Sequence, residues 1–168
     1  GFGLIALLPA WAVEVLKGDV ITNGWLLSAR GVGSLIGALI LASLGARKIR
    51  GRIWAWSSLL VPILWLVFAW MTIIPLSLLS IAFVGLFIIM TVNLSNAMVQ
   101  TQVEDALRGR VMGIYTMVFF GFNPLGSLLA GYAADQIGEQ WTVSFCAIVL
   151  LLVAIFNWVK MPYVRELD

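Results

Sequence analysis

The chain has 168 residues, of which 62% are hydrophobic and 11% charged, and its formal net charge is +2. A soluble domain is about half apolar and about a quarter charged, so this composition indicates an integral membrane protein. The single cysteine, Cys146, excludes an internal disulfide, and the absence of histidine removes the usual metal sites and histidine-based catalytic triads. We therefore expect no enzymatic activity and no cofactor, and so small a net charge does not indicate nucleic acid as a partner.

Six apolar segments follow one another along the chain. The first, at about residues 1–16, is too short to cross a bilayer alone, and we expect it to continue upstream. At about 1.5 Å per residue the other five can each span a hydrocarbon core of about 30 Å. They lie at about residues 24–46, 53–73, 76–102, 110–135 and 140–160. The predicted fold is an all-α membrane protein with six transmembrane helices.

The connections between the segments contain recognisable helix signals. Thr22 or Asn23 is predicted to cap the second segment. The third and fourth form a hairpin that turns near residues 72–75, because Pro75 disfavours a continuous helix there. Residues 104–110 are predicted to be a charged loop before the fifth segment.

The fifth segment contains several small or helix-loosening residues, which suit a helix that packs closely or moves. They are Gly121, Asn123, Pro124, Gly126, Ala130 and Gly131. The Asn123-Pro124 pair suggests a flexing point, and a static kink is the alternative.

Basic residues are distributed unevenly between the two faces implied by six alternating segments. One face has Arg47, Lys48, Arg50, Arg52, Arg108, Arg110, Lys160 and Arg165, whereas the other has only Lys17. By the positive-inside rule the first face and the C-terminus are cytoplasmic. Tryptophans near the predicted segment ends suit the membrane interfaces, and these are Trp11, Trp25, Trp54, Trp56, Trp70, Trp141 and Trp158.

An internal repeat emerges when the chain is shifted by 93 positions. Residues 33–36 then align with residues 126–129, in segments of opposite direction, and Arg30 aligns with Asn123. This alignment predicts two three-helix repeats of inverted topology, as in many transporters. Chance similarity is the alternative, because Gly, Ser and Leu are common in the chain.

The stretch EDALRGRVMGIYTMVFFGFNPLGSLLAGYAADQIG, together with the first two segments, resembles the C-terminal six-helix half of a major facilitator superfamily transporter. The similarity is greatest to the enterobactin-exporter-like and macrolide-efflux-like branch, whose loop D-x-L-R-G-R-V-M-x-x-Y is present here. That loop corresponds to Asp105, Leu107, Arg108, Gly109, Arg110, Val111, Met112 and Tyr115. The resemblance covers essentially the whole chain.

The resemblance implies half of a twelve-helix, two-bundle protein in the inner (plasma) membrane of a prokaryote, working by alternating access with a site between the bundles. The implied partner is an N-terminal six-helix half on the same polypeptide. Of the family signature G-x-x-x-D-x-x-G, the chain keeps Gly131, Asp135 and Gly138, but residues 41–43 replace the aspartate of the cytoplasmic copy. This difference weakens the case for a charge-relay gate on the cytoplasmic side.

Polar side chains within the apolar segments are the candidates for a substrate pathway. Arg30 needs water, an anion or a partner, unless its side chain reaches the outer interface. Asn93, Asn96 and Gln100 form a stripe that either lines a cavity or hydrogen-bonds to a neighbouring helix. Tyr115 is on roughly the same face as Asn123. Gly33 and Gly37 have the small-xxx-small spacing of a close helix contact.

Two functions remain open. The first is secondary active export, as an antiporter, of a small amphipathic molecule such as a drug or siderophore. No phosphate-binding loop is present, and the acids near the segments, Glu14 and Asp135, are close to the outer surface. A proton carrier is therefore expected in the N-terminal half. The alternative is a non-transporting structural subunit that packs against other membrane subunits in the lipid bilayer.

Overall fold

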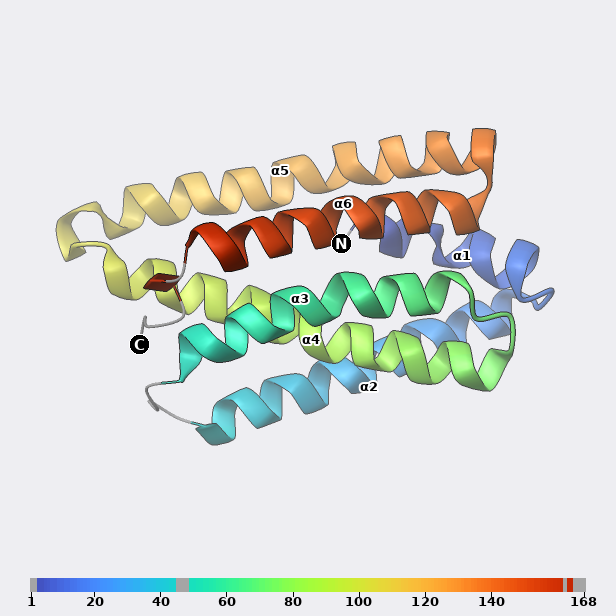
Figure 1. The fold of residues 1–168 in the computed structure, drawn as a ribbon, viewed down its shortest axis with the longest axis horizontal. Coiled ribbons are helices and arrows are strands. Elements are labelled where there is room, and N and C mark those ends of the chain that lie inside the picture. Colours follow the sequence, from blue (N-terminus) through green and yellow to red (C-terminus); the bar gives the residue numbers. More distant parts are fainter. Residues whose placement is uncertain (1–2, 45–48, 162, 165–168) are drawn as a thin grey trace.

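The computed structural model describes residues 3–44, 49–161 and 163–164. Within this part of the chain every regular element is a helix (Figure 1). The first segment is irregularly wound, with a 3₁₀ turn at Gly3–Leu7, a short α1 at Leu8–Ala10 and a π turn at Trp11–Val15. Five long helices follow: α2 (Val20–Leu44), α3 (Arg50–Ala69), α4 (Ile74–Gln102), α5 (Asp105–Ile137) and α6 (Glu139–Lys160). All five are long and apolar enough to cross a membrane, so the protein is an all-helical, multi-pass membrane protein.

Helix α2 begins earlier than the sequence pattern suggests. Thr22 and Asn23 are inside the helix, and the capping side chain is Asp19. Its Oδ1 accepts hydrogen bonds from the Thr22 backbone N–H (2.9 Å) and hydroxyl (3.1 Å). These bonds hold the pKa of the Asp19 carboxyl below its ordinary value. Thr22 is not the capping residue but its partner in a capping box, because the Thr22 Oγ1 accepts a hydrogen bond from the Asp19 backbone N–H.

Helix α5 also begins earlier than predicted, and this corrects the predicted charged loop. Asp105, Arg108 and Arg110 belong to the first two turns of the helix. An acidic residue in the first turn suits the positive end of the helix dipole, and Asp105 is ion-paired with Arg108 one turn away. With 33 residues, α5 is about 50 Å long, which exceeds the hydrocarbon core.

Two sharp turns, between α3 and α4 and between α5 and α6, lie at the end of the bundle away from the start of α5 (Figure 1). Between α3 and α4 the chain turns at residues 70–73, and Pro75 occupies the first turn of α4, where no backbone N–H is needed. Between α5 and α6 the turn is the single residue Gly138, whose φ of 85° favours glycine. Its N–H donates to the carbonyl of Ala134 at 2.8 Å, which closes α5.

The helices pack in two groups: α2, α3 and α4 form one, and the first segment, α5 and α6 form the other. Contacts between α3 and α6 join the two groups. Helix α4 contacts α2 and α3, whereas α5 packs against the 3₁₀ turn and α6. Helix α5 is the least covered, with only Ala130 and Ala134 buried. Its large apolar side chains face outward, as expected for contact with lipid or other transmembrane helices.

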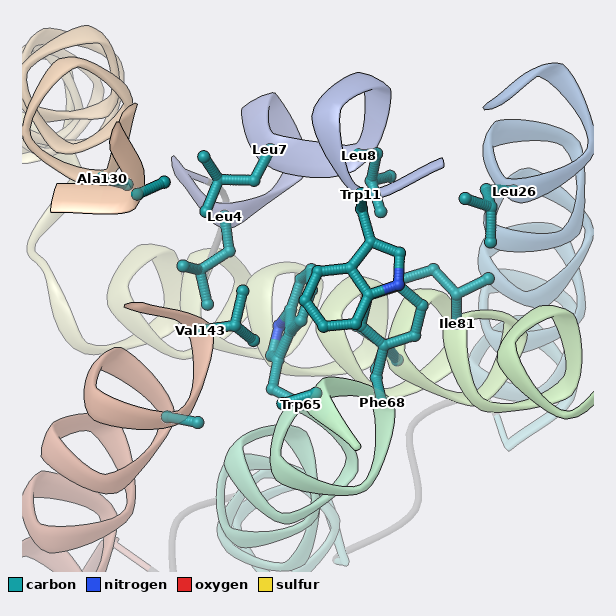
Figure 2. Close-up of a cluster of buried hydrophobic side chains, with 14 of the residues drawn as sticks. Leu4, Leu7, Leu8, Trp11, Leu26, Trp65, Phe68, Ile81, Ala130 and Val143 are labelled. Carbon is teal, nitrogen blue, oxygen red and sulfur yellow. The ribbon is translucent and has the colours of Figure 1, made fainter. Parts of the chain in front are cut away.

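An aromatic cluster forms the centre of the core (Figure 2). Trp11 stacks on Phe68 with 4.7 Å between ring centroids, and Trp65 meets Phe68 edge-on at 5.6 Å. All three are completely buried. The Trp11 ring is therefore packed inside the bundle. Its position at a membrane interface stays a prediction. The indole nitrogens of Trp11 and Trp65 have no hydrogen-bond partner among the described residues.

The closest helix contact joins α2 and α4. A Cβ atom at Gly33 would lie 1.8 Å from the carbonyl oxygen of Ala82, and one at Gly37 would lie 2.6 Å from that of Leu86. From α4, Gly85 faces the backbone of α2 in the same way. The Ser34 hydroxyl donates to the Gly85 carbonyl at 3.2 Å and so bridges the two helices.

Candidate substrate cavity

A cavity of about 440 Å³ lies between the 3₁₀ turn, α5 and α6. Its size is within the range of about 300–1,000 Å³ found for small-molecule sites. The walls are almost entirely apolar and include three phenylalanine rings. The lining residues are Gly3, Leu4, Phe119, Phe122, Asn123, Gly126, Ala130, Phe145, Cys146, Val149 and Leu150.

Asn123 is the one residue of this lining with a hydrogen-bonding side chain of the amide or hydroxyl type. Its Oδ1 is buried and has no hydrogen-bond partner among the described residues. A buried acceptor of this kind costs free energy until a donor reaches it. Asn123 thus supplies the one amide of this lining, and its Oδ1 must turn outward before a bound molecule can donate to it.

Helix α5 remains continuous through Pro124 beside this asparagine. The proline ring removes the N–H that would bond to the carbonyl of Phe120. One turn later, the Ser127 hydroxyl donates to the carbonyl of Asn123 at 3.1 Å. Gly126 is where α5 meets the first segment, since a Cβ at Gly3 would lie 3.0 Å from the Gly126 carbonyl carbon.

Tyr115 is connected to the cavity through an aromatic neighbour. Its ring stacks on Phe119 with 6.1 Å between centroids and an interplanar angle of 13°. Phe119 lines the cavity, whereas Tyr115 lies outside the lining. Because Phe119 is four residues from both Tyr115 and Asn123, helical spacing alone could have added it to the candidates.

Arg30 is in a different place, at the contact between α2 and α4. Its side chain is half-buried, and its Nε is buried without a hydrogen-bond partner among the described residues. Its Cγ lies over Gly85 of α4. The structure thus separates Arg30 from the cavity that contains Asn123.

The polar stripe of α4 also lies apart from the cavity lining. Asn93 and Gln100 are exposed, and the Gln100 Nε2 donates to the Oδ1 of Asn96 within the same helix. The described link from this part of α4 to a neighbouring helix involves another residue, Ser95, whose hydroxyl accepts a bond of 2.7 Å from the Trp54 Nε1 of α3.

The remaining candidates have varied surroundings. Pro124 and Asp135 are exposed, and a Cβ at Gly131 would meet nothing within 4 Å. Arg108 pairs with Asp105, and Arg110 is exposed. Arg47 and Lys48 are outside the described residues.

Sequence reasoning missed most of the apolar wall, notably Phe122, Phe145 and Cys146. Phenylalanine in an apolar segment gives no sign of whether it faces lipid, core or cavity. The two α6 residues become recognisable only when α5 and α6 are placed side by side.

These features define a multi-pass helical membrane protein with an open, drug-sized, largely apolar cavity between α5, α6 and the first segment. The chain belongs to the transmembrane secretion effector family of the major facilitator superfamily, whose profile matches residues 2–168. The family points to transport and not to enzymatic catalysis.

Curated relatives are similar over most of the chain. The protein named multidrug efflux pump Tap of Mycobacterium tuberculosis (strain H37Rv) is 32% identical over 145 residues, which cover 86% of this chain and 34% of the relative. The Tap protein of Mycolicibacterium fortuitum is also 32% identical, over 35% of its length. The chain spans about a third of the length of the curated relatives it matches. No solved structure is significantly similar to it.

Proposed function

We propose that the chain forms one half of a secondary active transporter that exports a small amphipathic molecule by alternating access. The observation that carries this proposal is the cavity with its unsatisfied Asn123 oxygen. Its apolar and aromatic walls suit a ring-containing molecule that offers one hydrogen-bond donor. The similarity to proteins named multidrug efflux pumps supports a drug as the exported molecule.

The helix contacts support the predicted organisation in two inverted three-helix repeats. In the proposed pairing, α2 corresponds to α5, α3 to α6 and α4 to the first segment. Helix α2 packs against α4 as α5 packs against the first segment, and α3 and α6 contact each other between them. Arg30 and Asn123 correspond in this pairing, and each has a buried polar atom without a described partner. We assign both residues to one substrate pathway.

The other half of the pathway is assigned to an N-terminal six-helix bundle on the same polypeptide. Helix α5 leaves a long apolar face and five glycines, at 109, 113, 121, 126 and 131, with open space where a Cβ would be. A helix from a second bundle could approach such a surface closely. The coupling ion, as in an antiporter, would then bind chiefly in that bundle.

The proposed orientation places the C-terminus in the cytoplasm of a prokaryotic cell, with the protein in its inner (plasma) membrane. The starts of α3 and α5 and the end of α6 carry the basic residues and lie at one end of the bundle (Figure 1). This end faces the cytoplasm by the positive-inside rule.

Thiol labelling tests the proposed cavity in the full-length polypeptide. Asn123→Cys, in a Cys146→Ser background, is treated with a water-soluble maleimide in membrane vesicles with and without ethidium, an aromatic test compound. We expect ethidium to slow labelling at position 123. The matched control is Gln136→Cys, an exposed position in the last turn of the same helix and outside the cavity lining, where ethidium should have no effect. If position 123 is never labelled in any state, α5 faces lipid or a permanent partner, and the structural-subunit alternative replaces export.

A further inference from the structure

Arg30 passes over a glycine of the neighbouring helix. A Cβ atom at Gly85 would lie 2.2 Å from the Arg30 carbonyl oxygen and 3.1 Å from the Arg30 Cγ. No real Cβ atom could occupy that position, so a side chain at residue 85 would displace both the backbone and the side chain of Arg30. The absence of a side chain at Gly85 therefore determines where the Arg30 stem can lie.

We propose that Gly85 is the positioning residue of Arg30 and directs its guanidinium toward an anionic group of the transported molecule. This inference rests on the proposed export function. It adds a substrate class, amphipathic molecules that carry a carboxylate or phosphate, and a residue that does not touch the substrate.

We infer an anionic ligand from the positive charge of Arg30. A cation within a transmembrane segment costs several kcal/mol unless water, an anion or another partner compensates it. The Nε of Arg30 is buried and has no hydrogen-bond partner among the described residues. The planar guanidinium can bind a carboxylate or phosphate through two parallel hydrogen bonds.

The contact between α2 and α4 holds the Arg30 backbone in a fixed position. The Ser34 hydroxyl, one turn after Arg30, donates to the carbonyl of Gly85 itself at 3.2 Å. Gly33 lies against the α4 backbone at Ala82. Because these contacts flank Arg30, the backbone that carries its side chain is already held in place before an anion binds.

Two dyes with the same ring system and different charge can show whether the transporter prefers a substrate with a carboxylate. Rhodamine 110 carries a free carboxylate, and rhodamine 123 is its methyl ester. Cells that produce the full-length polypeptide are loaded with each dye, and the ratio of their export rates is recorded alongside protein abundance in the membrane. If Arg30 binds the substrate carboxylate, Arg30→Gln should lower the ratio of rhodamine 110 to rhodamine 123 export by roughly threefold or more. If Arg30 instead binds a lipid phosphate, the ratio stays unchanged.

The role of Gly85 is tested by a double-mutant cycle. We expect Gly85→Ala to lower the same ratio, and to have no further effect on it in the Arg30→Gln background. Gly31→Ala is the matched control, since a Cβ there meets nothing within 4 Å. Gly33→Ala disturbs the same helix contact away from the Arg30 stem and should reduce export of both dyes equally. Additive effects of Gly85→Ala and Arg30→Gln overturn the proposal.

A gentler variant covers the case in which Gly85→Ala does not accumulate. Ser34→Ala removes the hydrogen bond to the Gly85 carbonyl without adding atoms. It should lower the dye ratio in the same direction, and an unchanged ratio counts against a positioning role.

A labelling experiment separates this inference from the export function. Arg30→Cys, in a Cys146→Ser background, is reacted with a water-soluble maleimide with and without Gly85→Ala. We expect Gly85→Ala to change the labelling rate by roughly threefold or more, and Gly31→Ala to leave it unchanged. If neither dye is exported but this change occurs, the export function fails while the positioning contact stands. If the dyes are exported and the labelling rate does not change, the positioning role fails alone.

Discussion

The carbonyl oxygen of Ala82 on α4 occupies the space where Gly33 on α2 would carry a Cβ atom, which would lie 1.8 Å away. At Gly37, one turn along α2, the backbone of α4 is again too close for a side chain. Over this stretch the two helices make direct backbone contact. Such contacts replace the hydrophobic effect as a source of helix association within lipid.

Substitution at this contact should destabilise the protein. We expect Gly33→Ala to cost about 1–3 kcal/mol by overpacking, and Gly33→Leu to prevent folding or the transport cycle. Gly31→Ala serves as control, since its Cβ would be free and alanine favours helix. Thermal unfolding of the purified full-length protein in detergent gives the comparison. Equal melting temperatures for Gly33→Ala and Gly31→Ala would contradict the observed contact.

The buried indole of Trp65 offers a second test. Trp65→Ala should cost about 3–5 kcal/mol, because it leaves a cavity in the centre of the core. Trp65→Phe should cost less, because it keeps most of the ring and removes an N–H that has no described partner. Trp25→Ala, at a position 61% exposed, should have little effect. The melting temperatures of the three variants test this order. A Trp65→Phe variant as unstable as Trp65→Ala would mean that the Trp65 indole N–H is hydrogen-bonded.

A single interhelical hydrogen bond is suited to a double-mutant cycle. The Trp54 Nε1 of α3 donates to the Ser95 hydroxyl of α4 at 2.7 Å. Trp54→Phe and Ser95→Ala should each remove it, with a coupling of about 0.6 kcal/mol, the average for such bonds in membrane proteins. Unfolding in detergent of the two single variants and the double variant gives the coupling. Fully additive losses would show that the bond contributes nothing.

The orientation of the bundle is open to a reporter experiment. The basic residues at one end predict that a reporter fused after Asp168 is in the cytoplasm. Paired fusions to green fluorescent protein, which fluoresces when folded in the cytoplasm, and to alkaline phosphatase, active only outside, provide the measurement. Activity of the phosphatase fusion alone would reverse the proposed topology.

The cap of α2 predicts a local response to acid. Hydrogen bonds from Thr22 lower the pKa of Asp19 below its ordinary value of 3.8. The ionised Asp19 cap should therefore stabilise α2 fully above pH 3.8. This stabilisation should be lost as the pH falls through the lower pKa of Asp19 in the folded protein. Hydrogen exchange at the Thr22 amide should lose protection over that acidic range. In Asp19→Ala, protection of the Thr22 amide should not change over this acidic range. If the unsubstituted protein loses this protection already near neutral pH, Asp19 is not the capping group.

The helices were predictable because a bilayer requires long apolar runs, and Pro75 and the charges near residue 104 mark their limits. Their starting residues were less predictable. Asp19 and Asp105 stabilise helix ends through local hydrogen bonding and charge, which apolar runs do not reveal. The spacing of Gly33 and Gly37 indicated a close contact but did not identify α4 as the partner.

The candidate cavity was predictable only in part. Asn123 and Gly126 stand out as small or polar residues in an apolar segment. Phe145 and Cys146 could not be selected, because their role depends on the side-by-side placement of α5 and α6. Gly85 also went unnoticed, since it lacks a second glycine at the spacing that draws attention to Gly33 and Gly37.

The irregular winding of the first segment affects which way its residues face. Gly3–Leu7 has the tighter turn of a 3₁₀-helix, and Trp11–Val15 has the wider turn of a π-helix, closed by the Leu16 N–H bond to the Trp11 carbonyl. The first turn advances the angular phase of the side chains, and the second delays it. Leu4 at one end of this segment and Leu16 just after it both belong to the same buried core.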